Sequence, residues 1–257
     1  MSKKKYDVAI IGAGVAGMTA AIYVRRAGKT AIVFEEKVPG GQIVSSSSVA
    51  NWPGEVGISG ADLSKKIKGQ MLKLGADLEY AEVSVIKKNK SGFSVETEDG
   101  EYSVGAVILA MGTEPRKLSE KQTKDAGDRA ISYCATCDGA LYQDKPVVVV
   151  GSGNTAKHET AYLSNIASKV YHIHHDEPIP KDAVAVFVAI GRVPHTEVAN
   201  GLVELDGDGY VVADENCETS CPGVFVAGDC RAKPLRQLVT AAADGAVAAN
   251  EAVHYLG

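Results

Sequence analysis

The sequence predicts an α/β protein with two lobes, and two observations support this fold class. The apolar runs Asp7–Ile11 and Val147–Val150 suit buried strands, and each leads into a glycine-rich turn and then a helical pattern. A strand, a glycine turn and a helix in this order open a Rossmann-like domain, whose parallel sheet is covered by helices on both faces. We therefore expect two Rossmann-like, three-layer domains in this chain of 257 residues, 45% of them hydrophobic.

The composition excludes several classes of function. The formal net charge is −5, whereas a nucleic-acid-binding face is usually basic, so nucleic acid is not expected as a partner. No apolar run is long enough to cross a membrane, and the first residues lack the apolar segment of a signal peptide. Five cysteines are too few for a secreted disulfide scaffold. These features predict a soluble, cytoplasmic protein without a membrane partner.

Local patterns define the elements of the first lobe. Leu63, Ile67 and Met71 recur at helical spacing, and Gly75 suits the end of that helix. The dipeptide Asp99-Gly100 is typical of a hairpin turn. The predicted elements are helices over Met18–Ala27 and Gly60–Leu74 and strands over Thr30–Phe34, Phe93–Glu98, Glu101–Val104 and Ala106–Ala110.

The second lobe follows a short polar linker at Glu114–Lys117. The charged stretch Ser119–Arg129 shows no core pattern, so we expect no element there. The remaining predicted elements are a helix from the second glycine turn to about Ile166, strands over Lys169–Ile173, Val184–Ile190, Tyr210–Ala213 and Val224–Ala227, and a long helix over Leu235–Leu256.

The first glycine turn has the residues of a dinucleotide site. Gly12, Gly14 and Gly17 stand between a strand and a helix, so backbone amides at the helix N-terminus can face a pyrophosphate. Glu35 lies 18 residues after Gly17 at the end of the next strand, where a carboxylate binds ribose hydroxyls. Asp229 follows another buried strand and can bind a second polyol or phosphate segment. The alternative is an ordinary βα turn with a solvated Glu35.

Two cysteines separated by two residues form the most specific motif of the chain. Cys134 and Cys137 can close a small disulfide, and this spacing commonly lowers the pKa of one thiol. The thiolate is the attacking species in disulfide exchange. Asp138 can pass a proton to the leaving thiolate. The alternative is half of a zinc site that Cys217 and Cys221 would complete.

Together these motifs resemble the low-molecular-weight thioredoxin reductases over nearly the whole chain. The phrases Pro39–Gln42, Ala50–Gly54 and Gly223–Asp229 occur in the order of that family. The resemblance implies FAD as the cofactor and a homodimer. The FAD-binding residues that it implies are Gly12, Gly14, Gly17, Glu35, Gly41, Gln42, Asn51, Gly112, Asp229 and Gln237.

The same resemblance implies roles for the cysteines. Cys137 would face the flavin, Cys134 would attack the disulfide of thioredoxin, and Asp138 would be the acid. Cys217, Cys221 and Cys230 have no catalytic counterpart and are interpreted as packing thiols.

The resemblance also divides the chain into domains. Residues 1–115 and 222–257 would form a discontinuous FAD-binding domain. Residues 116–221 would form a truncated NADPH-type domain that carries the dithiol.

The second glycine turn departs from the family in its charges. Gly151 and Gly153 match the pyrophosphate turn of an NADPH domain. Relatives then carry a His-Arg-Arg phrase that binds the 2′-phosphate, whereas His172–Pro178 of this chain contains no arginine. Asp176 and Glu177 would instead repel the phosphate. The three histidines of this segment are not expected to bind a metal ion.

The spacing after this turn departs further. Nine residues, two of them proline, separate His174 from Val184, whereas a parallel crossover needs a dozen or more and usually a helix. We therefore expect that an internal deletion has removed the part of the domain that would surround the adenosine and the nicotinamide.

This pattern is similar to that of the ferredoxin-dependent flavin thioredoxin reductases. It implies that reduced ferredoxin supplies electrons, through FAD and the Cys134–Cys137 dithiol, to thioredoxin. Three alternatives share the motifs. They are a dithiol oxidase that uses oxygen, an NAD(P)H-dependent thioredoxin reductase with a degenerate nucleotide site, and a non-enzymatic flavin redox sensor.

Overall fold

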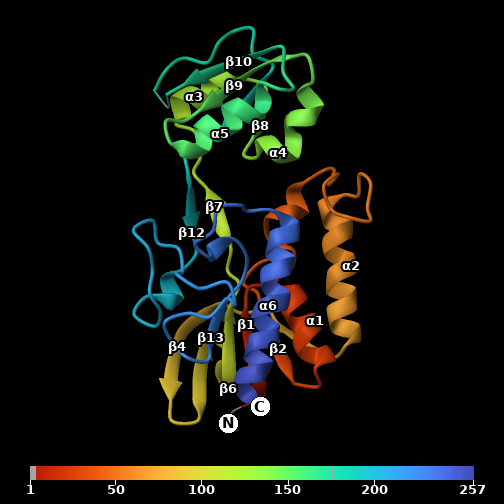
Figure 1. Ribbon diagram of the computed structural model, residues 1–257, viewed down its shortest axis with the longest axis vertical. Coiled ribbons are helices and arrows are strands. Elements are labelled where there is room, and N and C mark those ends of the chain that lie inside the picture. Colours follow the sequence, from red (N-terminus) through yellow and green to blue (C-terminus); the bar gives the residue numbers. More distant parts are fainter. Residues whose placement is uncertain (1–3, 175) are drawn as a thin grey trace. The chain divides into compact units, whose positions relative to one another are not determined.

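The computed structural model describes residues 4–174 and 176–257, which form two compact units (Figure 1). Unit 1 contains Met1–Thr113 and Pro194–Gly257, and unit 2 contains Glu114–Val193. Within the described residues, no helix has the length and apolar character needed to span a membrane.

The second boundary between the units differs from the expected one. The sequence assigns residues 194–221 to the truncated domain, whereas the structure packs them in unit 1. The reason is apolar burial, because Ala199, Val203 and Val211 belong to the core on one face of the unit 1 sheet.

Unit 1 is built on a seven-stranded sheet with the order β3-β2-β1-β6-β5-β4, in which β13 also pairs with β6. Strands β3, β2, β1, β6 and β13 are parallel, and β4 and β5 are antiparallel. The strands are β1 (Lys4–Ile11), β2 (Ala31–Phe34), β3 (Asp77–Glu79), β4 (Val83–Asn89), β5 (Gly92–Thr97), β6 (Gly100–Leu109) and β13 (Val224–Val226).

Both faces of this sheet are covered. Val8 and Ile10 of β1 lie in one core cluster, and their neighbours Ala9 and Ile11 lie in another. This explains why the second half of β1, Val8–Ile11, is continuously apolar rather than alternating. The helices of unit 1 are α1 (Val15–Arg26), α2 (Gly60–Lys73) and α6 (Leu238–Leu256). Helices α1 and α6 lie side by side (Figure 1), and their contact is close because a Cβ atom on Gly245 would be 2.3 Å from the Ala16 carbonyl oxygen.

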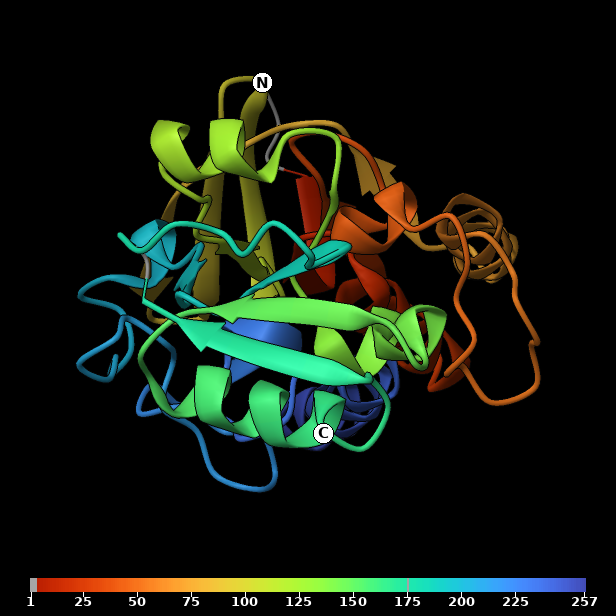
Figure 2. The same cartoon turned by 90° about the horizontal axis from the view of Figure 1, so that it is seen from above.

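Unit 2 contains a parallel four-stranded sheet with the order β10-β9-β11-β8. Its strands are β8 (Ala130–Ser132), β9 (Pro146–Val150), β10 (Lys169–Ile173) and β11 (Ala185–Val188), and its helices are α3 (Glu120–Ala126), α4 (Ala135–Asp138) and α5 (Asn154–Leu163). Figure 2 shows α3 and α5 on opposite sides of β9 and β10, in agreement with two separate core clusters. The strands β7 (Thr113–Pro115) and β12 (Arg192–Pro194) pair with each other.

Three local predictions are wrong. Ser119–Arg129 contains α3, whose N-terminus is capped by the Ser119 side chain. The predicted strands Glu101–Val104 and Ala106–Ala110 are replaced by one continuous strand, β6, which runs from Gly100 to Leu109. Tyr210–Ala213 makes isolated bridges instead of a strand. The α/β class with two Rossmann-like domains, the second truncated, is confirmed.

Candidate active site

The first glycine turn leaves an open space in front of helix α1. Gly12 has a φ of +104°, and a Cβ atom on it would be 2.5 Å from the Ala110 carbonyl oxygen. A Cβ atom on Gly17 would be 1.9 Å from the Gly12 carbonyl oxygen, so this glycine permits close packing of the helix on the turn. A Cβ atom on Gly14 would have no neighbour within 4 Å. Gly14 is the N-cap of α1 and has no side-chain cap, so a ligand phosphate can approach the helix amides there.

Glu35 is held beside this turn. Its Oε2 accepts a hydrogen bond from the Ala13 amide at 2.8 Å, and its Oε1 accepts one from the Lys37 amide at 3.0 Å. Each carboxylate oxygen has a second lone pair, so the group can still accept hydrogen bonds from ribose hydroxyls.

The structure gathers other predicted FAD-binding residues in unit 1. A Cβ atom on Gly41 would be 3.6 Å from the Gly14 Cα atom, which places Gly41 at the same turn. The Gln42 amide donates to the Thr113 carbonyl, next to Gly112. Asn51 donates to Gln237 Oε1 at 3.0 Å, although the two residues are far apart in the sequence. Gln237 is the N-cap of α6.

Asp229 lies near the first turn of α1. It follows Gly228, whose Cβ atom would be 2.8 Å from Ala16 Cβ. The Gly228 amide donates to the buried Asp244 carboxylate at 3.0 Å, and Lys233 and Arg231 bind the same carboxylate at 2.8 and 3.2 Å. This ion cluster fixes the segment between β13 and α6, and the sequence analysis had not identified it.

The two motif cysteines form a disulfide in unit 2. The bond joins Cys134 and Cys137, whose Cα atoms are 5.3 Å apart. Cys134 is the N-cap of the short helix α4, and its carbonyl accepts hydrogen bonds from the Cys137 and Asp138 amides. The disulfide excludes the alternative in which these two sulfurs serve as zinc ligands in this state.

Ser132 organises the dithiol segment, and sequence reasoning missed it. Its hydroxyl donates to Asp138 Oδ2 at 2.6 Å and accepts from the Cys134 amide at 3.1 Å. The serine therefore connects the predicted acid to the backbone of the first cysteine. Its position two residues before Cys134, at the end of β8, was the available signal.

The carboxyl of Glu159 also lies at this segment. Its Oε1 accepts a long hydrogen bond, 3.5 Å, from the Ala135 amide directly after Cys134. Glu159 belongs to α5 and is far from the cysteines in the sequence, so the contact could not be predicted from the sequence. Burial raises the pKa of this carboxyl, partly offset by the Ala135 amide and the positive charge of Arg192.

The second glycine turn has the same backbone form as the first but different surroundings. A Cβ atom on Gly151 would be 2.3 Å from the Ala189 carbonyl oxygen, and one on Gly153 would have no neighbour within 4 Å. The ring of His172 lies 2.9 Å from the Gly151 carbonyl oxygen, and the ring of His174 lies 2.7 Å from the Ser152 hydroxyl. Side chains of the chain itself therefore bind this turn.

No group of three or more potential metal ligands is found within residues 4–174 and 176–257. His172 and His174 bind the glycine turn, and His175, which the sequence analysis also considered, lies outside the described residues.

The other three cysteines are free thiols buried in unit 1. Burial raises the pKa of Cys217 and of Cys230 to about 11. At about pH 8 only about one in a thousand of these thiols is ionised, so both are poor nucleophiles.

We expect iodoacetamide to leave Cys217 and Cys230 unmodified in the native oxidised protein at about pH 8, as measured by peptide mass spectrometry. The denatured protein is the control, in which all three free thiols should react. Rapid labelling of Cys217 in the native state would contradict its assignment as a packing thiol.

Comparisons with known proteins agree with this arrangement. A model of the pyridine nucleotide-disulphide oxidoreductase family matches residues 6–181 and 175–246. The chain belongs to this family. A thioredoxin reductase of Listeria monocytogenes is 34% identical over 302 aligned positions, which cover 99% of this chain and 95% of that protein.

Solved structures give the same assignment. Thioredoxin reductase from Giardia duodenalis superposes with a TM-score of 0.92 at 30% identity, over 99% of each chain. A ferredoxin-flavin thioredoxin reductase from Clostridium acetobutylicum superposes with a TM-score of 0.64 at 27% identity, over 98% of each chain. The protein is thus a flavoprotein disulfide reductase of the thioredoxin reductase type.

FAD is the cofactor of this family, and unit 1 fits it. The open face at Gly14 suits the pyrophosphate, and Glu35 suits a ribose. In the second turn, by contrast, His174 binds the hydroxyl beside the open glycine.

Proposed function

We propose that this protein reduces thioredoxin with electrons from reduced ferredoxin, which pass through FAD and the Cys134–Cys137 disulfide. The observation that carries this proposal is the connection between β10 and β11. Only residues 174–184 join these parallel strands, and the described part of that connection contains neither helix nor strand. A complete nucleotide-binding domain would have more of its crossovers built from helices.

The comparisons support a deletion at this connection. An alignment of 302 positions with a chain of 257 residues leaves at least 45 positions opposite gaps in this chain. The two segments that match the family model meet at residues 175–181, inside the β10–β11 connection. The missing residues would then come from the part of the domain that follows the second strand of the nucleotide fold.

The contacts of this connection support the proposal as well. Glu177 Oε2 accepts a hydrogen bond from the His174 amide at 2.8 Å, which holds a carboxylate beside His174. Gln122 of α3 donates to the His174 and Glu177 carbonyls and ties the loop to the sheet. A negative charge held near the second turn opposes a bound 2′-phosphate.

The residues of the chain would divide the reaction as follows. FAD, when bound, stores electrons that arrive singly and delivers them as a pair. Two electrons and one proton convert the disulfide to one thiol and one thiolate, and Asp138, held by Ser132, supplies the proton of the thiol. The Cys134 thiolate attacks the thioredoxin disulfide and forms a mixed disulfide. Cys137 then attacks Cys134, which releases reduced thioredoxin and restores the disulfide.

The energetics favour this direction. A ferredoxin near about −400 mV and thioredoxin near about −270 mV differ by roughly 130 mV, which is about 6 kcal/mol for two electrons.

The FAD and dithiol roles of the individual residues, the homodimer and the cytoplasmic location belong to the same proposal.

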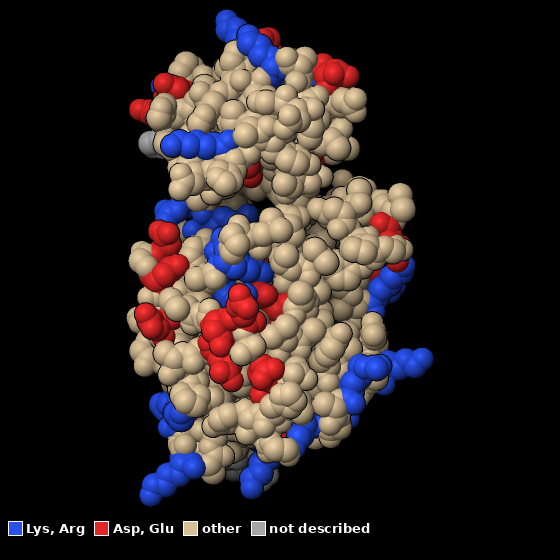
Figure 3. Space-filling model, viewed as in Figure 1, with Lys and Arg blue, Asp and Glu red and all other residues tan. Residues whose placement is uncertain are grey.

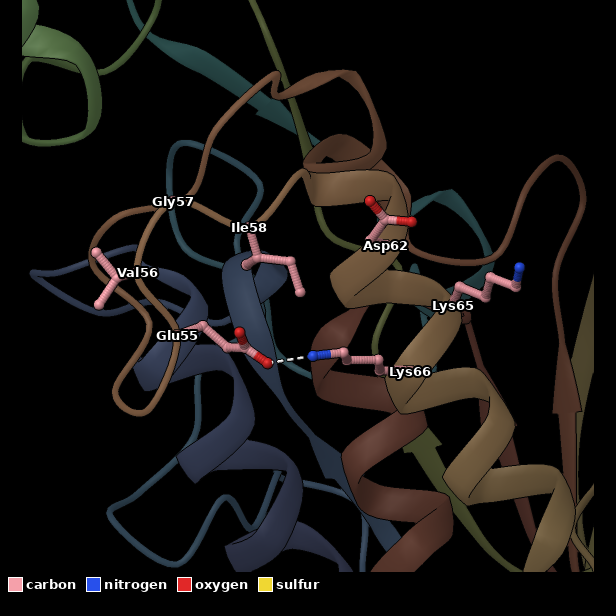
Figure 4. Close-up of a pocket in the computed structure, with 7 residues that line it drawn as sticks. All are labelled: Glu55, Val56, Gly57, Ile58, Asp62, Lys65 and Lys66. Atoms are coloured by element: carbon pink, nitrogen blue, oxygen red, sulfur yellow. Dashed lines mark hydrogen bonds and ion pairs between the residues drawn. The ribbon is translucent and has the colours of Figure 1, made fainter.

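Surface charge limits where an acidic ferredoxin could dock. Segment 204–218 of unit 1 exposes many carboxylates, and Figure 3 shows acidic side chains gathered on the face that it draws. Helix α2 presents Lys65, Lys66 and Lys73 instead, but Lys66 is paired with Glu55 at a shallow pocket (Figure 4). We therefore favour the lysine side of α2 over segment 204–218 as a docking face.

The decisive experiment offers the purified holoenzyme three donors without oxygen. We expect thioredoxin reduction with reduced ferredoxin and at most background rates with NADPH or NADH. The NADH arm is essential because Glu177 follows a strand, where an acid can bind the ribose of NAD. Flavin bleaching by micromolar NADPH or NADH would overturn the proposal.

Two controls separate the remaining alternatives. Omitting ferredoxin excludes direct reduction by the chemical reductant that regenerates it. Peroxide release with a small dithiol and oxygen, without any thioredoxin reduction, would identify an oxidase. A redox-dependent protein contact without turnover by any donor would identify a sensor.

A further inference from the structure

Glu159 is a partly buried carboxyl that the reaction described above does not use. Its Oε1 is bound by the Ala135 amide at 3.5 Å, whereas its Oε2 is shielded from solvent and has no hydrogen-bond partner among the described residues. A buried carboxylate oxygen that accepts no hydrogen bond lowers the stability of the folded protein. Such a group therefore calls for an explanation, which can be a functional role or a compensating interaction.

Opposing influences act on the charge of Glu159. Burial favours the neutral acid and is the largest influence on its pKa, which it raises. The Ala135 amide and the positive charge of Arg192 favour the carboxylate. The carboxyl therefore keeps its proton to a higher pH than an ordinary glutamate.

The ionisable groups on the elements around α5 are few. Strand β9 is entirely apolar (Pro146–Val150). Asp138 of α4 binds Ser132, and the His172 ring of β10 binds the Gly151 carbonyl. The other ionisable groups on β10 and α5 are Lys169, Tyr171, Lys157, His158 and Tyr162, and Tyr142 lies in the short 3-10 helix Gly139–Tyr142 that follows α4.

Reduction of the disulfide is the event that changes the charge beside this carboxyl. Ala135, whose amide binds Glu159, lies directly after Cys134 and within the loop that the disulfide closes. Opening the disulfide with two electrons leaves negative charge on the sulfurs until protons arrive. A new negative charge beside a carboxylate favours the protonated carboxyl.

We propose that Glu159 is a positioning residue of the dithiol, which holds the Ala135 amide and takes up one proton when the disulfide is reduced. The balance is two electrons and two protons for each disulfide. One proton goes to a sulfur through Asp138, and the other goes from solvent to the Glu159 carboxylate. One sulfur then stays a thiolate, ready to attack the substrate disulfide. This inference does not depend on whether the donor is ferredoxin or a pyridine nucleotide.

The test is a redox titration of the dithiol in Glu159→Gln, which keeps the size of the side chain but cannot ionise. The holoenzyme is equilibrated with oxidised and reduced dithiothreitol from about pH 6 to about pH 9, acid-quenched and alkylated. Mass spectrometry of the Cys134–Cys137 peptide then gives the reduction potential at each pH.

In the native protein we expect a two-proton dependence, a hundredfold change in the equilibrium constant per pH unit, or about 59 mV. In Glu159→Gln the slope should fall to the one-proton value, about 30 mV per unit, over the same pH range. Glu159→Asp, which keeps a carboxyl, should restore the two-proton slope. Glu120→Gln, the loss of an exposed carboxylate in the same unit, is the matched control and should leave the profile unchanged.

Identical pH profiles for Glu159→Gln and the native protein would overturn the proposal. A reduction potential shifted by the same amount at every pH, with an unchanged slope, would also overturn it, because it would show that Glu159 has a structural role alone. If Glu159→Gln does not fold, redox-difference infrared spectra of the native protein decide the question. A protonated-carboxyl band must appear on reduction, and its absence would refute the proton uptake.

Discussion

Cys134→Ser is expected to abolish thioredoxin reduction while leaving reduction of the flavin by the donor intact. A serine hydroxyl stays protonated near neutral pH and cannot replace the thiolate that attacks a disulfide, so turnover should fall by at least about a thousandfold. The dithiol segment should keep its shape, because Ser132 binds the Cys134 amide and not its sulfur. Stopped-flow absorbance of the flavin and a thioredoxin turnover assay measure the two steps separately.

Cys137→Ser is the matched variant. It should retain attack by Cys134 but lose the resolving thiol, so a mixed disulfide with thioredoxin should accumulate and be visible on a non-reducing gel. Cys134→Ser should form no such adduct. An adduct with Cys134→Ser and none with Cys137→Ser would mean that the two roles are reversed.

Gly14→Ala should weaken FAD binding without unfolding the protein. Gly14 has φ −70° and ψ −178°, a conformation open to any residue, and its Cβ atom would have no neighbour within 4 Å. The methyl group would instead occupy the space through which a pyrophosphate reaches the amides of α1. We expect FAD affinity to fall about a hundredfold, equivalent to about 3 kcal/mol. Flavin fluorescence titration measures the affinity, and the circular dichroism of the apoprotein checks the fold.

Gly153→Ala is its counterpart in unit 2. Gly153 caps α5 with φ −84° and ψ −176°, and a Cβ atom there also has open space. If no dinucleotide binds this turn, the substitution should leave ferredoxin-supported turnover within about twofold of the native rate. A loss of activity with any nicotinamide donor would reveal a working site. Gly17→Ala, whose Cβ atom would be 1.9 Å from a carbonyl oxygen, should by contrast fail to fold.

Much of the fold follows from the sequence because its two glycine turns join strands buried on both faces. Such segments, the second half of β1 and all of β9 here, form continuous apolar runs in the sequence. Helix α3 escaped prediction because only Gln122 and Ala126 of it are buried, too few for a helical stripe. The placement of residues 194–221 depends on burial against a sheet formed by remote segments.

In the site, too, local motifs could be predicted from the sequence, whereas contacts made by tertiary packing could not. Cys134, Cys137 and Asp138 are adjacent in the sequence, so their motif could be recognised directly. Glu159 meets the dithiol only because α5 packs against α4, and no local pattern encodes that contact. The Asn51–Gln237 hydrogen bond likewise depends on tertiary packing, because it joins the two separate sequence segments that form unit 1.

The histidine contacts at the second glycine turn bear on attempts to redesign the electron donor. Replacing Asp176 and Glu177 with arginines would remove the negative charge that opposes a 2′-phosphate. It would not remove the side chain that competes with a nucleotide for the second glycine turn. His174 would still contact the Ser152 hydroxyl, and an incoming nucleotide would have to displace that internal partner. If the nucleotide site is degenerate as proposed, conversion to NADPH use requires removal of the imidazole together with insertion of a helical crossover, and either change alone should yield no gain.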